Sequence, residues 1–206
     1  MGLVKLNDRG VRSATTFGSL NTGSMVFIKK LTASASGTLS FVDGASDVVI
    51  DSTYKEYMFT FKDLHPSNTD VDGIGFQANV AGGSGYDETI TSTYFRSTHD
   101  EAGTGGAVAY QASQDQAQGT GFQNIGQNVG TDNDQTVAGY LHIFNPSDTT
   151  FVTHFIARTN NYHQDDKSRD VYVAGYFNTT AALDEFQFKF SAGNIDAGDI
   201  CLYGIK

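Results

Sequence analysis

Five histidines are the residues best suited to bind a metal ion or transfer a proton: His65, His99, His142, His154 and His163. His142 and His154 lie in two strand-like segments separated by a polar loop, and a pairing of Phe144 with Phe151 places the two rings on opposite faces. A one-residue change of register would bring them together. A zinc site needs a third ligand at a recognisable spacing, and none is present. We therefore expect half-buried, hydrogen-bonded histidines and predict no metal and no cofactor.

Hydrolytic chemistry is not selected by any pattern either. His99-Asp100-Glu101 places two acids beside a histidine, but neighbouring strand residues face opposite ways, which favours a solvated turn. No Gly-x-Ser-x-Gly elbow occurs, and nothing among the 23 acidic residues singles out the carboxylate pair of a glycosidase. We predict that the protein has no catalytic residue and is not an enzyme.

Acidic loops offer oxygen ligands of the kind that calcium prefers. They are Asp70-x-Asp72, Asp132-Asn133-Asp134 and Asp165-Asp166. None of them has the full spacing of a calcium-binding loop with its distal glutamate. The sequence therefore predicts solvated acidic turns.

Tyr162 is the residue that best fits a sugar-binding platform. It follows Asn160-Asn161 and precedes Asp165, so that amide and acid groups would surround an aromatic ring on a loop. The chain has no tryptophan, which is a common platform residue in such sites. The two interpretations are a glycan or receptor contact at Tyr162, Asn160 and Asp165, or an exposed tyrosine at a loop tip.

The element that must position these residues is a strand beginning near Tyr54 and closed by Pro66. Tyr57, Phe59 and Phe61 alternate with Met58, Thr60 and Lys62, which is the period of a strand with one face in a core. Pro66 cannot donate to a sheet ladder. Further strands are expected around 25–31, 39–43, 74–80, 89–97, 122–125, 171–177, 186–190 and 200–205. Residues 107–118 fit either helix or strand.

The segment from 137 to 158 predicts a β-hairpin with apolar residues on both faces. If residues 145–150 form its loop, one face carries Tyr140, Phe144, Phe151 and Phe155. Leu141, Ile143 and Ile156 then lie on the other face. An ordinary half-solvated antiparallel sheet needs only one apolar face. Either another part of the chain covers the second face or another subunit does, and we predict an assembly face at Tyr140, Phe144, Phe151 and Phe155.

Composition sets the class of protein. The formal charge is −10, the sequence pI is about 4.7 and Lys29-Lys30 is the one basic doublet, which disfavours nucleic-acid binding. One cysteine allows no internal disulfide, and no apolar run is long enough to span a membrane. We expect a soluble all-β protein, an antiparallel β-sandwich of jelly-roll type. Residues 1–24 form an N-terminal arm, an edge strand or a frayed terminus, and 25–206 form a single domain.

Three segments resemble a module that recurs in virion proteins of tailed phages. The first is the aromatic strand 54–61 followed by Leu64-His65-Pro66, and the second is the loop Gly82-Gly83-Ser84-Gly85-Tyr86. The third is the ending 186–205, a strand, a Gly193-Asn194 turn and a last strand of the form Gly-x-Ile-x-Leu-Tyr-Gly-Ile. Residues 3–13 are also similar to the start of marine phage structural proteins. Gly85 departs from the loop pattern of the module.

This resemblance implies a β-sandwich component of a phage particle, made in the host cytoplasm and located on the capsid surface or the tail. It implies no catalytic residue. The expected function is structural, as a capsid decoration or cement protein or a tail or fibre appendage. The expected partners are further copies of the chain, as a homo-oligomer such as a trimer, and other virion proteins. The alternative is a glycan-binding receptor module of a tail fibre, and a third hypothesis is a glycan depolymerase.

Overall fold

The structure is a computed structural model that describes residues 23–68 and 73–206. Most of the predicted N-terminal arm, 1–24, lies outside the described residues, and so does the acidic loop Asp70-x-Asp72. The division into an arm and one domain, 25–206, therefore stays a prediction.

The described residues form an antiparallel all-β sandwich without a helix, which confirms the predicted fold class. Nine strands make one sheet and four make the other. The strands are β1 (Met25–Thr32), β2 (Leu39–Val42), β3 (Glu56–Pro66), β4 (Ile74–Val80), β5 (Ile90–Asp100), β6 (Gly106–Tyr110), β7 (Ala117–Gly119), β8 (Gln123–Asn124), β9 (Val137–Phe144), β10 (His154–His163), β11 (Lys167–Phe177), β12 (Leu183–Phe190) and β13 (Ile195–Ile205).

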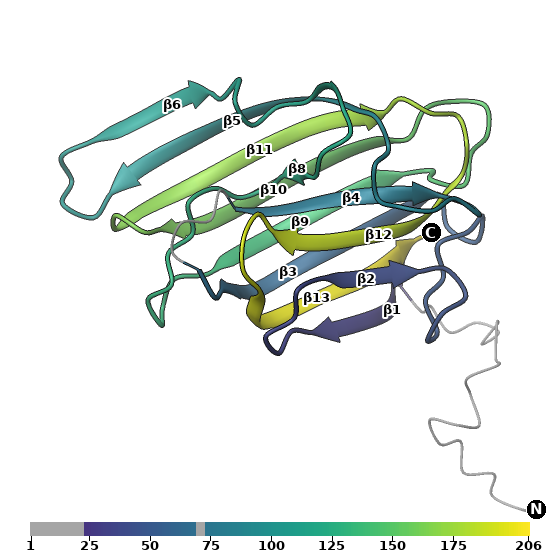
Figure 1. Cartoon of the computed structure of the whole chain (residues 1–206), viewed down its shortest axis with the longest axis horizontal. Coiled ribbons are helices and arrows are strands. Elements are labelled where there is room, and N and C mark those ends of the chain that lie inside the picture. Colours follow the sequence, from purple (N-terminus) through teal and green to yellow (C-terminus); the bar gives the residue numbers. More distant parts are fainter. Residues whose placement is uncertain (1–22, 69–72) are drawn as a thin grey trace, which may run out of the picture.

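The chain crosses repeatedly between the two sheets, as in a jelly roll (Figure 1). The large sheet has the order β1-β13-β3-β9-β10-β11-β5-β6, with β7 also paired to β5, and the small sheet has the order β2-β12-β4-β8. We call the face of the large sheet that packs on the small sheet its inner face, and the opposite face its outer face. The stretch 107–118 contains β6 and the start of β7 rather than a helix.

Strand β3 belongs to the large sheet and turns one face toward the core, as its alternation predicts. Tyr57, Phe59 and Phe61 are buried on the inner face. The ring of Phe59 lies 5.2 Å from that of Phe41 on β2 and 5.0 Å from that of Phe188 on β12, measured between centroids. Edge-to-face and tilted packing of this kind adds to the free energy gained by burying the rings. The core is therefore an aromatic layer between the sheets.

The predicted register of the β9–β10 hairpin is wrong. Phe144 pairs with His154 rather than with Phe151, so the loop extends over residues 145–153. The carboxylate of Asp148 accepts hydrogen bonds from the backbone N–H groups of Thr150 and Phe151, at 2.6 and 2.9 Å. These bonds hold Phe151 in the loop instead of the ladder. The shift of three positions is odd, so every side chain of β10 changes face.

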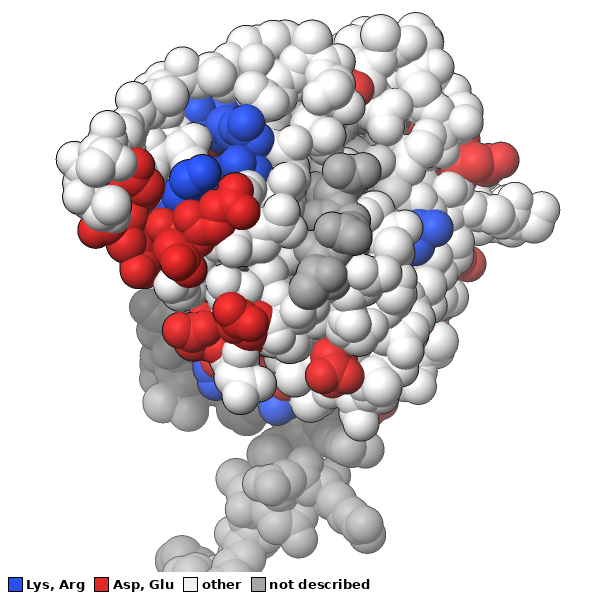
Figure 2. Space-filling model, turned by 60° about the vertical axis from the view of Figure 1, so that its left-hand side comes forward, with Lys and Arg blue, Asp and Glu red and all other residues white. Residues whose placement is uncertain are grey.

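At the end of the large sheet that holds the β5–β6 and β10–β11 turns, polar residues replace apolar ones on the inner face. Thr159, Asn161 and Arg169 are each at most 5% exposed there. The small sheet does not reach this end, and the segment between β8 and β9 covers it instead. Asn161 Nδ2 donates to the carbonyl oxygen of Gln127 at 2.9 Å. Lys and Arg side chains gather in a hollow at this end, with Asp and Glu side chains beside it (Figure 2).

His163 is buried at this same end, 4% exposed, and its Nδ1 accepts a hydrogen bond from the backbone N–H of Asp165 at 3.0 Å. Burial, together with the charge of Arg169, lowers its pKa from 6.5 to about 4. The folded protein therefore keeps His163 neutral at a pH where the unfolded chain would protonate it. The contribution of His163 to the free energy of unfolding is fully present above pH 6.5, and it is lost as the pH falls toward about 4.

We expect the free energy of unfolding to fall by roughly 1–3 kcal/mol between pH 7 and pH 4.5 because of this one group. Urea unfolding at a series of pH values measures the loss. His163→Gln should flatten the curve in this interval, while His99→Gln, at an exposed position of β5, should leave it unchanged. An equally steep curve in His163→Gln would show that other groups carry the pH dependence.

No helix in the described part of the chain is long and apolar enough to cross a membrane.

Candidate functional site

The outer face of the large sheet carries most of the exposed apolar surface. Among the described residues, eight large hydrophobic side chains are exposed, and seven of them project from this face: Met25, Phe27, Phe95, Val108, Tyr110, Tyr140 and Ile156. Scattered apolar residues on a surface are ordinary, but a contiguous apolar patch marks an interaction site. No described strand packs against this face (Figure 1).

An aromatic row runs across five strands of the outer face. It consists of Tyr110, Phe95, Tyr172, Arg158 and Tyr140, which are successive cross-strand partners on β6, β5, β11, β10 and β9. The rings of Phe95 and Tyr172 stack with their centroids 4.8 Å apart, and the guanidinium of Arg158 lies 4.8 Å from the centre of the Tyr172 ring. Such contacts hold flat side chains in a fixed arrangement before any partner arrives.

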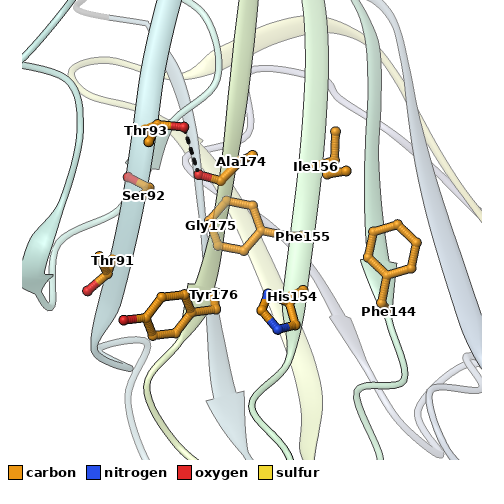
Figure 3. Close-up of a pocket in the computed structure, with 10 residues that line it drawn as sticks. All are labelled: Thr91, Ser92, Thr93, Phe144, His154, Phe155, Ile156, Ala174, Gly175 and Tyr176. Atoms are coloured by element: carbon orange, nitrogen blue, oxygen red, sulfur yellow. Dashed lines mark hydrogen bonds between the residues drawn. The ribbon is translucent and has the colours of Figure 1, made fainter.

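Beside this row lies a shallow apolar trough of about 540 Å³, which we call the outer trough. Ala174 and Gly175 form its floor because their side chains are too small to fill the space. Figure 3 shows Ile156 and Phe144 on one side and Thr91 and Tyr176 on the other, with His154 near its lower end. Thr93 Oγ1 donates to the carbonyl oxygen of Ala174 at 3.4 Å. The trough offers an apolar partner side chain a place to insert.

The charged groups of the outer face occur largely in pairs. Arg158 Nε and Nη2 donate to the two carboxylate oxygens of Asp170, at 3.1 and 2.8 Å. This bidentate bond holds the pKa of Asp170 below its usual value. His142 Nε2 lies 2.9 Å from the Glu56 carboxylate, and Lys30 Nζ lies 3.3 Å from that of Asp199. Pairing within the face leaves its net charge small, although the chain as a whole carries −10.

The four residues predicted to form an assembly face do not lie together. Tyr140 and Phe144 project from the outer face. Phe151 lies in the β9–β10 loop and is 72% exposed. Phe155 is 1% exposed on the inner face, against the rings of Phe76 and Phe177. The inclusion of Phe155 was wrong, because the register shift of the hairpin moves it into the core.

The same shift corrects the expectation for two histidines. His142 and His154 both lie on the outer face, opposite Ile156 and Phe144 respectively. The ring of His142 packs against Phe144 at a centroid distance of 4.2 Å. Within the described ranges, no group of three or more His, Cys, Asp or Glu residues is arranged to hold a metal ion.

The sequence predicts that Tyr162 lies on a loop, but it lies near the end of strand β10. Asn160 and Asn161 belong to the same strand. It lines a polar pocket of about 270 Å³ together with His99, Asp100, Glu101, Asn160, Asn161 and Ser168, which we call the Tyr162 pocket. A hydrogen bond to the carboxylate of Glu101 raises the pKa of Tyr162 to about 12. Asp165 lies in the adjoining turn, 3.5 Å from Lys167 Nζ, and does not line the pocket.

The comparisons with known proteins do not identify a relative. No family model matches the chain, no curated protein matches it, and no solved structure matches it.

Sequence reasoning did not find the aromatic row or the outer trough. A signal for both was present in β11, where Tyr172, Ala174 and Tyr176 alternate with Val171 and Val173. That alternation indicates apolar residues on both faces of the strand. It does not reveal that Phe95 and Tyr110, distant in the sequence, extend the row.

Proposed function

We propose that the protein is a non-enzymatic structural component of a tailed-phage particle, and that it acts by assembling with further copies of itself through the outer face of the large sheet. The observation that carries the assembly is the concentration of exposed aromatic and aliphatic side chains on this one face. The resemblance of the strand 54–61 and of the ending 186–205 to phage virion proteins supports the proposal that the protein belongs to a phage particle. The role is that of a capsid decoration protein or a tail or fibre appendage.

The electrostatics of the outer face favour a second copy of this chain as its binding partner. Two copies with a net charge of −10 each repel one another over most of their surfaces. The outer face is the exception, because Arg158–Asp170 and Lys30–Asp199 neutralise each other within it. Contact there buries apolar surface with little like-charge repulsion. Most oligomers of a single chain are closed and symmetric, which fits a dimer or a trimer.

The mass of the full chain in solution tests this proposal. Light scattering coupled to gel filtration should give a single oligomeric species at micromolar concentration, with a trimer expected. The oligomer should persist in 1 M salt, because burial of apolar surface resists screening while exposed ion pairs do not. A monomer at all concentrations up to about 100 μM, a weak affinity by the usual conversion, would contradict the proposal.

The Tyr162 pocket favours a second candidate function, the binding of a glycan on a host surface. It combines an aromatic ring with the amide of Asn160 and the carboxylates of Asp100 and Glu101, and such groups can hydrogen-bond sugar hydroxyls. A panel of host surface polysaccharides should then contain one that raises the melting temperature of the protein. Tyr162→Ala should abolish this increase.

The matched control for that experiment is Tyr140→Ala, which removes a tyrosine from the outer face and leaves the pocket intact. A glycan that stabilises wild type and Tyr140→Ala equally, but not Tyr162→Ala, supports binding in the pocket. Equal stabilisation of all three proteins would place the glycan elsewhere.

A further inference from the structure

We infer that the hollow between β5, β6 and β11, on the inner face beyond the small sheet, is a binding site for a small oxyanion of the carboxylate, sulfate or phosphate type. The hollow has a volume of about 390 Å³, and its lining includes Arg96, Thr98, Lys167 and Arg169. Figure 2 shows its Lys and Arg side chains gathered in a depression of the surface. This inference does not depend on the proposed function.

The sheet register brings the cations together. Arg169 pairs with Thr98, Val171 pairs with Arg96, and Lys167 pairs with Asp100. Arg96, Thr98, Lys167 and Arg169 therefore project from the same face of two adjacent strands, over three successive rows of residues. The neighbouring β6 supplies Gly106 and Ala107, whose small size leaves the space above the guanidinium groups open.

The two guanidinium groups converge on a neutral oxygen rather than on a carboxylate. Nη1 of Arg96 and Nη1 of Arg169 both donate to the side-chain oxygen of Gln127, and Arg169 Nη1 also donates to the Gln127 carbonyl at 3.1 Å. Among the residues that the structure describes, no carboxylate lies within 4.0 Å of either group. An amide oxygen satisfies hydrogen bonds but provides no paired countercharge for either guanidinium group.

Arg169 is the member of this pair whose burial points to a ligand. Its side chain is only 5% exposed, and its Nε–H has no hydrogen-bond partner within the described part of the chain. A buried donor without a partner is costly, and more so when it belongs to a charged group. Burial and the neighbouring charge of Arg96 also lower the pKa of Arg169 to about 10. An oxyanion in the hollow would supply the countercharge that the two guanidinium groups lack.

The surroundings limit the size and charge of the ligand. Asp100 lines the same hollow, and Asp165 lies 3.5 Å from Lys167 Nζ. These carboxylates, with the net charge of −10, disfavour a polyanion such as a nucleic acid. One planar or tetrahedral oxyanion suits the guanidinium fork, which binds carboxylates and phosphates through paired N–H groups. A single acidic group on a small molecule or a sugar fits this description.

Titration of the full-length protein with sodium glucuronate, sulfate and phosphate tests the site, with sodium chloride at matched ionic strength as the reference. At least one of the three anions should raise the melting temperature saturably above the chloride reference, and the one that binds identifies the class of ligand. Arg96→Gln, at a half-buried position, should weaken that binding roughly 10- to 100-fold. Lys62→Gln, which removes the same charge from an exposed position on β3, should change it less than about twofold.

A second readout separates anion binding from a purely structural role. In a low-ionic-strength buffer without these anions, Arg96→Gln should melt no lower than wild type, because it removes the repulsion with Arg169. If no anion stabilises wild type beyond chloride, or if Arg96→Gln responds as strongly as wild type, the inference is wrong. A lower melting temperature of Arg96→Gln without any anion effect in wild type would assign the two arginines to the fold alone.

Discussion

Ile156→Asp is expected to convert the proposed oligomer into a folded monomer. Ile156 is 47% exposed and forms part of the wall of the outer trough. A carboxylate at this position would have to lose its hydration when a second copy covers the face, and no unpaired cation of the trough is available to compensate it. We expect the dissociation constant of the oligomer to rise at least 100-fold, which corresponds to about 2.7 kcal/mol. Analytical ultracentrifugation over a concentration series measures this change.

The matched control is Ala181→Asp, which places the same charge at an exposed position of the loop before β12. It should leave the oligomer intact. Circular dichroism and the melting temperature at low protein concentration should show that Ile156→Asp remains folded, since exposed substitutions usually change stability by less than about 0.5 kcal/mol. If Ile156→Asp assembles as wild type does, the outer trough is not part of the interface.

Phe59→Ala is expected to remove much of the stability of the fold. Phe59 is fully buried, and its ring contacts Phe41, Phe186 and Phe188, all of which belong to the small sheet. Truncation leaves a cavity between the two sheets where neither backbone can move in. We expect a loss of about 3–5 kcal/mol in the free energy of unfolding. Since natural domains are stable by only about 5–15 kcal/mol, the variant should be partly unfolded in mild denaturant.

Urea unfolding of Phe59→Ala and of Thr60→Ala measures the effect with the neighbouring residue as its control. Thr60 projects from the opposite face of β3 and is only half-buried, so its truncation should cost less than about 1 kcal/mol. Similar losses in the two variants would mean that packing between the sheets does not dominate stability. The comparison tests the alternation of β3 directly.

The alternation of polar and apolar residues is a local property, and it predicted most of the strands. Tyr57, Phe59 and Phe61 indicated a buried face of β3, and the structure places all three in the core. The segment 107–118, which fitted either helix or strand, was decided by pairing: β5 supplies the hydrogen-bonding partners of β6 and β7. Sequence propensity alone cannot anticipate which neighbour a short segment will find.

The register of the β9–β10 hairpin shows why the candidate site was only partly predictable. Its strands were recognisable from their composition. The length of the loop depends on which backbone N–H groups donate hydrogen bonds to the Asp148 carboxylate. That local detail decided whether Phe155 or Ile156 faces outward. The outer face of the large sheet therefore carries Tyr140 and Phe144, while Phe155 lies in the core.

The sequence by itself determined that this protein is an antiparallel β-sandwich with more apolar side chains than one core can bury. Strand periodicity and composition are local properties, which can be read from each segment alone. Only the tertiary structure decided where the remaining apolar side chains lie. The aromatic row joins five strands, and the basic hollow joins residues of β5 and β11 that are more than 60 positions apart, through sheet pairing. Cross-strand neighbours depend on strand order and register, which many distant contacts set together and no single segment encodes.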